Sequence, residues 1–138
     1  MTLAEYAVQT IVELMDKVQK ESVAAAKDAS EERIHDLRVS IRRLSETLRV
    51  FEDVCPDDSA AAIRKDLKQA MRLAGRIRNH DVAAELAKKS KVTVSASSDE
   101  ERAQAVRELG EVLTKWNKGV IYKIWRTELH AKKAGKRA

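Results

Sequence analysis

The chain has 138 residues, of which 43% are hydrophobic, 36% charged and only 4% aromatic, with one Pro and a formal net charge of +5. This composition is typical of a helical domain. The scarcity of aromatic side chains argues against a surface that stacks the bases of single-stranded nucleic acid. The positive charge favours a polyanionic partner without identifying it.

A single cysteine, Cys55, excludes an intrachain disulfide and a metal site built from thiolates. The N-terminal residues carry acidic side chains within an apolar pattern, which indicates a helix and not a signal peptide. No apolar run approaches the ~20 residues that span a bilayer. We therefore expect a cytoplasmic protein that does not enter a membrane.

Periodicity predicts two helices in the first part of the chain. The first covers about Thr2–Asp28, where apolar residues recur every three or four positions. Ser30 is the predicted N-cap of the second helix, which ends near Asp53 because Pro56 cannot continue it.

Two further helices are predicted after this proline. The third begins after the capping candidates at 57–59 and reaches about Lys89. Ser98 and Glu101 form a predicted capping box for the fourth, which runs to about His130. Four long helices with short connections predict an all-α fold, an antiparallel four-helix bundle.

Basic residues follow one strip of the second predicted helix, beside the core face. At ~100° per residue this strip contains four residues within roughly 60° of one another, and Arg43 points elsewhere. Arg and Lys stems also cover apolar surface on many helices, which is the ordinary alternative to an anion site. The strip consists of His35, Arg38, Arg42 and Arg49.

The third predicted helix carries a matching strip with Arg64, Lys68 and Arg78. Gly75 lies on the same strip and costs about 1 kcal/mol relative to Ala, which suggests close approach of a backbone or a ligand. The alternative is a glycine that the helix merely tolerates. Asp81 falls on the core side, where it needs a partner such as Arg38 or Arg78. The alternative for Asp81 is a partly exposed position near a turn.

Two segments together resemble the CHAD family of histidine-containing α-helical domains. "IHDLRVSIRRLSETLRVF" (34–51) is similar to its first motif, His–x–x–Arg–Val followed by paired basic residues. "LKQAMRLAGRIRNHDVAAEL" (67–86) is similar to its second motif, which leads through glycine to Arg–x–x–Asp–Val. This sequence departs from the family pattern at two positions. Ser45 stands where the family often has a basic residue, and Asn79 stands where it often has an acidic residue.

The resemblance implies a basic cavity that binds inorganic polyphosphate. We expect no cofactor and no metal. The three histidines of the chain lie on different predicted helices without metal-ligand spacing. Carried over by motif, the polyphosphate-binding positions are His35, Arg38, Arg42, Arg43, Lys68 and Arg78, and the acidic position is Asp81. To these the helical strips add Arg49 and Arg64.

Typical members of the family have two similar four-helix halves, and this chain has material for one half. We therefore expect residues 1–130 to form a single CHAD-like domain, residues 131–138 a disordered basic tail, and two copies to form a homodimer. Surplus apolar residues of the fourth helix are candidates for that interface, although both tryptophans could instead pack inside the bundle. They are Trp116, Val120, Ile121, Ile124 and Trp125.

The leading hypothesis is a non-catalytic polyphosphate-binding module, located in the cytoplasm, with association with polyphosphate granules left open. Nucleic-acid binding shares the same phosphate chemistry and is the main alternative. A phosphohydrolase is less favoured because no clustered carboxylates accompany the basic strips. A purely structural bundle with solvated basic strips is the fourth reading.

Overall fold

The computed structural model describes residues 1–56, 58–91, 96–118, 122–127 and 129, and within these ranges the regular structure is entirely helical. The predicted all-α class is confirmed. The main elements are α1 (Leu3–Lys27), α2 (Glu31–Val50), the short 3-10 helix η1 (Glu52–Val54), α3 (Ser59–Lys89) and α4 (Ala96–Asn117).

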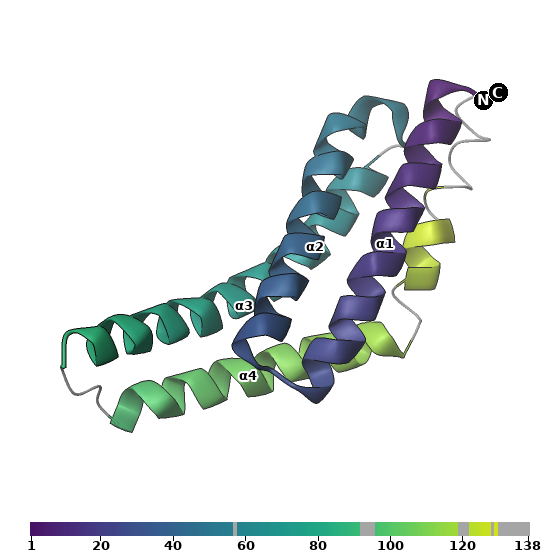
Figure 1. The fold of residues 1–138 in the computed structure, drawn as a ribbon. Coiled ribbons are helices and arrows are strands. Elements are labelled where there is room, and N and C mark those ends of the chain that lie inside the picture. The colour runs from purple at the N-terminus through teal and green to yellow at the C-terminus, as the bar shows by residue number, and fades with distance from the viewer. Residues whose placement is uncertain (57, 92–95, 119–121, 128, 130–138) are drawn as a thin grey trace.

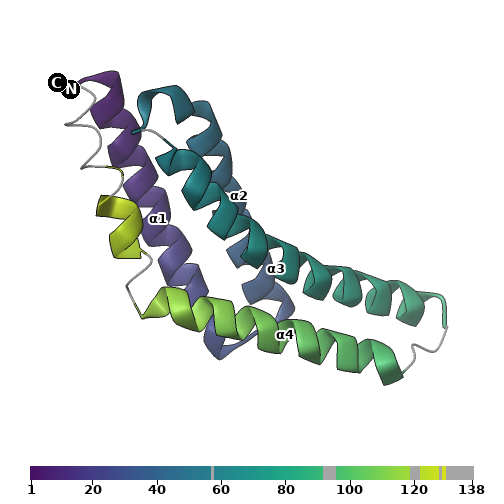
Figure 2. The same ribbon diagram turned by 180° about the vertical axis from the view of Figure 1, so that it is seen from behind.

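The four long helices pack as an antiparallel bundle, as predicted. Packed neighbours are α1 with α2, α2 with α3, α3 with α4, and α4 with α1. The C-terminal part of α3 and the N-terminal part of α4 lie side by side and project away from α1 and α2 (Figures 1 and 2). Only the N-terminal part of α3 therefore runs along α2.

The helix starts of α1 and α2 follow from their caps. The Thr2 hydroxyl accepts a hydrogen bond from the backbone N–H of Glu5, and the Glu5 carboxylate accepts one from the N–H of Thr2. Ser30 caps α2 by accepting from the N–H of Arg33. Such caps satisfy backbone donors that have no partner within the helix.

Two boundary predictions are wrong. Helix α4 begins at Ala96, so Ser98 lies inside its first turn and does not cap it. The same helix ends at Asn117 and does not run to His130. Residues 122–127 form a separate helical segment that lies along α1 (Figure 1), where Arg126 pairs with Asp16.

The aromatic residues at the end of α4 and in the segment 122–127 close the core and do not form an exposed interface. Trp116, Tyr122 and Trp125 are all 5% exposed or less, and their rings meet edge to face at centroid distances of 5.4–6.4 Å. The proposal that both tryptophans serve a dimer interface is wrong, because packing inside the chain already buries them. Of the other candidates, Ile124 is exposed, and Val120 and Ile121 lie outside the described residues.

Within the described ranges, no helix is both long enough and apolar enough to cross a membrane.

Candidate anion-binding groove

A groove of about 550 Å³ lies between α2 and the N-terminal part of α3. Five of the eleven residues that line it are Lys or Arg, and one is acidic. We call it the α2–α3 groove. Its lining residues are Ile41, Arg42, Ser45, Glu46, Arg49, Ala61, Arg64, Lys65, Leu67, Lys68 and Met71.

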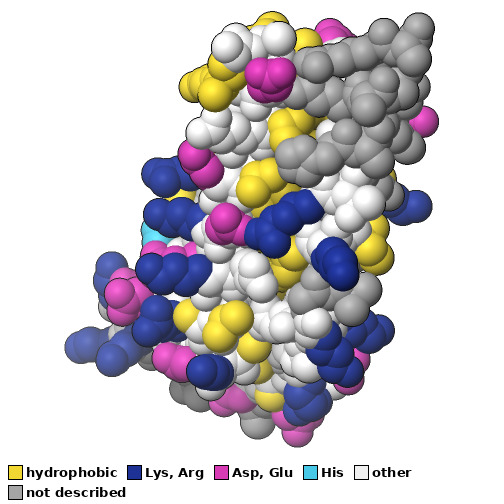
Figure 3. All heavy atoms as spheres, turned by 90° about the vertical axis from the view of Figure 1, so that its right-hand side faces the viewer, with side chains coloured by type: hydrophobic (Ala, Val, Ile, Leu, Met, Phe, Trp, Pro, Cys, Tyr) yellow, Lys and Arg dark blue, Asp and Glu magenta, His cyan; other side chains and the backbone are white. Residues whose placement is uncertain are grey.

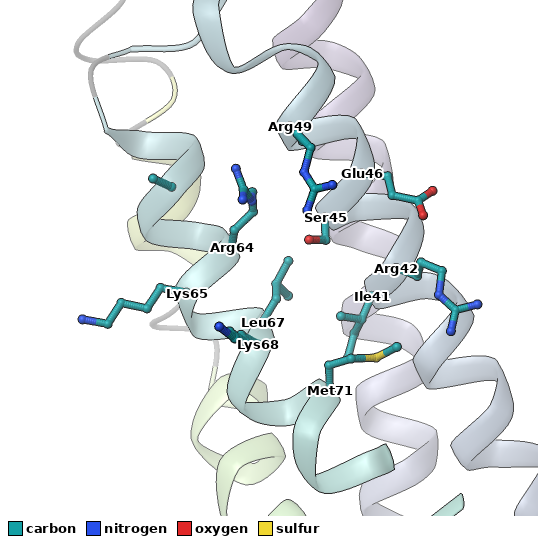
Figure 4. Close-up of a pocket in the computed structure, with 11 residues that line it drawn as sticks. Ile41, Arg42, Ser45, Glu46, Arg49, Arg64, Lys65, Leu67, Lys68 and Met71 are labelled. Atoms are coloured by element: carbon teal, nitrogen blue, oxygen red, sulfur yellow. The ribbon is translucent and has the colours of Figure 1, made fainter.

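The antiparallel packing of α2 and α3 brings basic residues of the two strips to the same gap. Arg49 of α2 faces Arg64 of α3, and both side chains point into the gap (Figure 4). Ser45 also points inward, whereas Arg42 and Lys65 extend away from it (Figure 4). Arg49 and Arg64 therefore provide the convergent guanidinium groups of this end of the groove.

The floor of the α2–α3 groove is apolar. Ile41 and Leu67 are each 1% exposed and belong to the hydrophobic core, and Met71 packs against that core. Burial of this floor fixes the rotation of both helices, since a turn of either helix would expose core residues. The same rotation directs the adjoining basic residues to the groove, as the helical periodicity predicts.

Further along α2, Arg38 lies close to two other arginines. Burial lowers the pKa of Arg38, and the positive charges of Arg78 and Arg42 lower it further. Its Nε atom is buried and has no hydrogen-bond partner among the residues that the structure describes. A half-buried guanidinium among like charges is costly unless an anion compensates it. The stretch around Arg38 and Arg78 is therefore a second candidate position for an anion.

His35 and Arg43 lie elsewhere, at a different groove. They line a cavity of about 290 Å³ between α1 and α2, together with the acidic Glu21 and Asp36. The structure thus brings Arg42, Arg49, Arg64 and Lys68 to one groove and does not bring His35 or Arg43 there. The helical angle places His35 at the edge of the basic strip. Because α1 packs beside this edge, His35 lines the cavity between α1 and α2 and not the α2–α3 groove.

Asp81 forms an ion pair, but the predicted partner was wrong. It binds Arg102 of α4 and neither Arg38 nor Arg78, with Arg102 Nε 2.7 Å from Asp81 Oδ1. A sequence signal for this contact exists, because Arg102 precedes Ala105 by three residues on the buried stripe of α4. That stripe contains Ala105, Leu109, Leu113 and Trp116.

Two residues of the groove and one beside it were missed by the sequence reasoning. Lys65 and Glu46 line the α2–α3 groove, and Glu52 of η1 lies 3.7 Å from the Arg64 guanidinium. Lys65 and Glu46 stand outside both basic strips, so periodicity alone could not place them at the rim. Among the residues that the structure describes, no three His, Cys, Asp or Glu side chains form a group that could hold a metal ion.

Fold and groove together define a class: an antiparallel helical bundle with cationic side chains gathered between its second and third helices. The chain belongs to the CHAD domain family, whose family model matches residues 9–136. The match begins within α1 and covers α2, α3 and α4 completely, and it includes part of the predicted tail, which lies outside the described residues. No curated protein and no solved structure matches the chain.

Proposed function

We propose that this CHAD domain is a non-catalytic binding module for inorganic polyphosphate, with the ligand in the α2–α3 groove. The observation that carries the proposal is the five Lys and Arg side chains that two antiparallel helices bring to one groove. Arg offers a fork of donors that fits phosphate oxygens, and Lys adds compact charge. Membership of the CHAD family supports the same ligand, as the sequence resemblance implied.

The shape of the basic strip favours a linear polyanion over a compact one. On α2 it extends from Arg38 to Arg49, ~16 Å at ~1.5 Å per residue. On α3 it extends from Arg64 to Arg78. A chain of several phosphates has both the length and the charge density to contact both stretches, whereas a single orthophosphate reaches only one.

Calorimetry with short and long polyphosphate is the direct test of this proposal. A ligand that binds only the native state must also raise the melting temperature, by an amount that grows with ligand concentration. Polyphosphate that neither releases heat nor shifts the melting temperature overturns the proposal. It would leave the groove as a solvated surface of a structural bundle.

Nucleic-acid binding is the second candidate, because duplex phosphates would meet the same side chains. In this structure the basic residues line a groove between two packed helices and do not stand on one protruding helix. We therefore expect polyphosphate to displace DNA at a far lower concentration of phosphate groups. Displacement in the reverse order would favour nucleic acid as the ligand.

The absence of catalysis is part of the proposal and needs its own assay. Phosphoanhydride hydrolysis usually uses metal ions bound by carboxylates. Glu46 lines the groove, and Glu52 lies 3.7 Å from Arg64. Incubation of polyphosphate with the protein and magnesium or manganese should release no phosphate. Release above the rate of a heat-inactivated control would identify an enzyme.

We also propose that residues 1–130 fold as one domain and that two copies associate in the cytoplasm. The support for association is that the resemblance implies a family built from two halves, of which this chain supplies one. The buried tryptophans give it no support. Sedimentation at micromolar concentration, with and without polyphosphate, tests it, and a monomer under both conditions overturns it. Fluorescence microscopy of the tagged protein tests the location, including at polyphosphate granules.

A further inference from the structure

The charge of the molecule is distributed unevenly along the α2–α3 groove. Residues 1–16 and 50–63 contain no Lys or Arg, and the two segments meet at one end of the bundle, where the rings of Tyr6 and Phe51 are 6.2 Å apart. Figure 3, which views the molecule from the right-hand side of Figure 1, where α1 lies, shows acidic and hydrophobic side chains, and no described Lys or Arg, at the upper end. The acidic residues of these segments are Glu5, Glu13, Asp16, Glu52, Asp53, Asp57 and Asp58.

This acidic end begins where the groove stops. Arg49 and Arg64 are the last basic residues before the α2–α3 turn on each helix. Beyond them Glu52 lies 3.7 Å from Arg64, and Asp53 and Asp58 are exposed. A polyanion that continued past the two arginines would have to cross this carboxylate-rich turn, where like charges repel it.

At the opposite end the basic strip continues. Arg38 is half-buried there, and burial and then the nearby positive charge of Arg78 lower its pKa. Asp81, three residues after Arg78, is paired with Arg102, and the charge of Glu31 also acts on Arg102. Asp36, two residues before Arg38, lines the cavity between α1 and α2. A bound polyanion is therefore repelled in the direction of the α2–α3 turn and can continue in the direction of Arg38 and Arg78.

From this asymmetry we propose that the groove binds the terminus of a polyphosphate chain and not its interior. The inference rests on the proposed function. The terminal phosphate lies between Arg49 and Arg64, and the chain runs along the strip towards Arg38 and Arg78. A terminal phosphate has one more ionisable oxygen than an internal one, which suits two converging guanidinium groups.

The stoichiometry on long chains is the primary test. A linear chain has two ends, so we expect saturation at no more than two protein molecules per chain, whatever its length. Binding along the chain would instead load protein in proportion to length. Calorimetric titration of short and long polyphosphate, expressed per chain and per phosphate group, separates these outcomes.

Chains with blocked ends give an independent test. Coupling a bulky amine to both terminal phosphates through P–N bonds leaves the internal phosphates unchanged. We expect such a chain to bind at least tenfold more weakly than the same chain with free ends. Equal affinity of the blocked and free chains overturns end recognition.

A charge variant tests the role of the acidic turn. Asp53→Asn with Asp58→Asn removes two carboxylates beyond the groove and leaves the Glu52–Arg64 pair in place. Asn tolerates the left-handed backbone that Asp58 adopts at φ 58°. We expect this variant to bind more than two molecules on each long chain, with its melting temperature close to that of the wild type.

The matched control is Glu101→Gln with Glu111→Gln, which removes the same charge from exposed positions of α4. It should keep the wild-type stoichiometry. If both variants raise the loading equally, overall charge and not the acidic turn is responsible, and the proposal fails. If no polyphosphate binds the wild type at all, the proposed function fails first; if loading follows chain length, the function stands and end recognition is overturned.

Discussion

Arg102 of α4 donates two hydrogen bonds to the Asp81 carboxylate of α3, from Nε to Oδ1 at 2.7 Å and from Nη2 to Oδ2 at 3.2 Å. A third hydrogen bond runs from its Nη2 to the carbonyl oxygen of Ala29, between α1 and α2, at 2.9 Å. The hydrogen bond to Asp81 raises the pKa of Arg102. One guanidinium thus joins α4, α3 and the α1–α2 connection.

Arg102→Ala should destabilise the fold without weakening polyphosphate binding. It leaves the Asp81 side chain, which is only 14% exposed, without this charged partner. We expect a loss of about 2–3 kcal/mol in the free energy of unfolding, measured with urea, because hydrogen bonds to charged groups are the stronger ones. Arg102→Lys keeps the charge but not the fork and should recover less than half of the loss. A change of Arg102→Ala below about 0.5 kcal/mol, the size of an ordinary surface substitution, contradicts this role.

Arg49→Ala and Arg64→Ala should each weaken polyphosphate binding strongly. Both side chains point into the α2–α3 groove (Figure 4), and losing a charged hydrogen bond costs about 1.5–3 kcal/mol, roughly tenfold to a hundredfold in Kd. Arg43→Ala removes the same charge from the α1–α2 groove and is the matched control. Calorimetry should show a much smaller effect for the control. Equal losses at all three positions would mean that diffuse charge, and not the groove, binds the ligand.

Polyphosphate affinity should depend steeply on salt. Each contact with a phosphate releases part of a condensed counterion, so the logarithm of affinity falls linearly with the logarithm of salt concentration. By analogy with single-stranded nucleic acids we expect a slope of about −0.7 per contact. Titrations at three or more salt concentrations measure it. A flat response excludes a site made of several arginines.

Gly75→Ala should act in opposite directions on stability and binding. A Cβ at Gly75 would meet no atom within 4 Å, so Ala should stabilise α3 by about 1 kcal/mol. The glycine lies on the strip between Lys68 and Arg78, and a ligand that packs against its backbone would meet the added methyl group. We expect a higher melting temperature together with weaker polyphosphate binding. Unchanged binding would show that no ligand approaches this position.

Alkaline pH should destabilise the protein through Tyr122. Burial raises the pKa of Tyr122 to about 12, although its hydrogen bond to Ser22 opposes the shift. In the unfolded chain the Tyr122 hydroxyl ionises near pH 10. Between pH 10 and about 12 the unfolded state therefore loses this proton while the folded state keeps it, which favours unfolding. The contribution is complete below pH 10 and is lost between pH 10 and about 12, by about 2–3 kcal/mol in total. The pH dependence of urea unfolding measures it.

Tyr122→Phe is the control for this pH dependence. Ser22 still donates to the Val18 carbonyl oxygen in the variant, so no hydroxyl is stranded. We expect a small loss at neutral pH, about 0.5–1.5 kcal/mol for one hydrogen bond. The stability difference between variant and wild type should shrink above pH 10 and then change sign, because the variant lacks the alkaline loss of about 2–3 kcal/mol. A constant difference across this range would assign the alkaline loss to other groups.

The sequence by itself determined the helices and the faces that they bury. Apolar spacing on α2 and α3 predicts the core, and the basic strips follow because burial of one stripe fixes the direction of every other side chain. The sequence also predicts the Ser30 cap of α2, because this cap depends only on Arg33, three residues further along the chain. Both motifs that carry the CHAD resemblance are local in the same sense.

Contacts between distant segments were decided only by the tertiary structure. Arg102 binds Asp81 across 21 residues, and Trp125 donates to Asp66 across 59. Helical angles group His35 with Arg38, but in the structure His35 lines the cavity between α1 and α2 because α1 packs on that side. Periodicity specifies the direction of a side chain around its own helix, whereas its partner depends on how helices pack, and that depends on the burial of the whole chain.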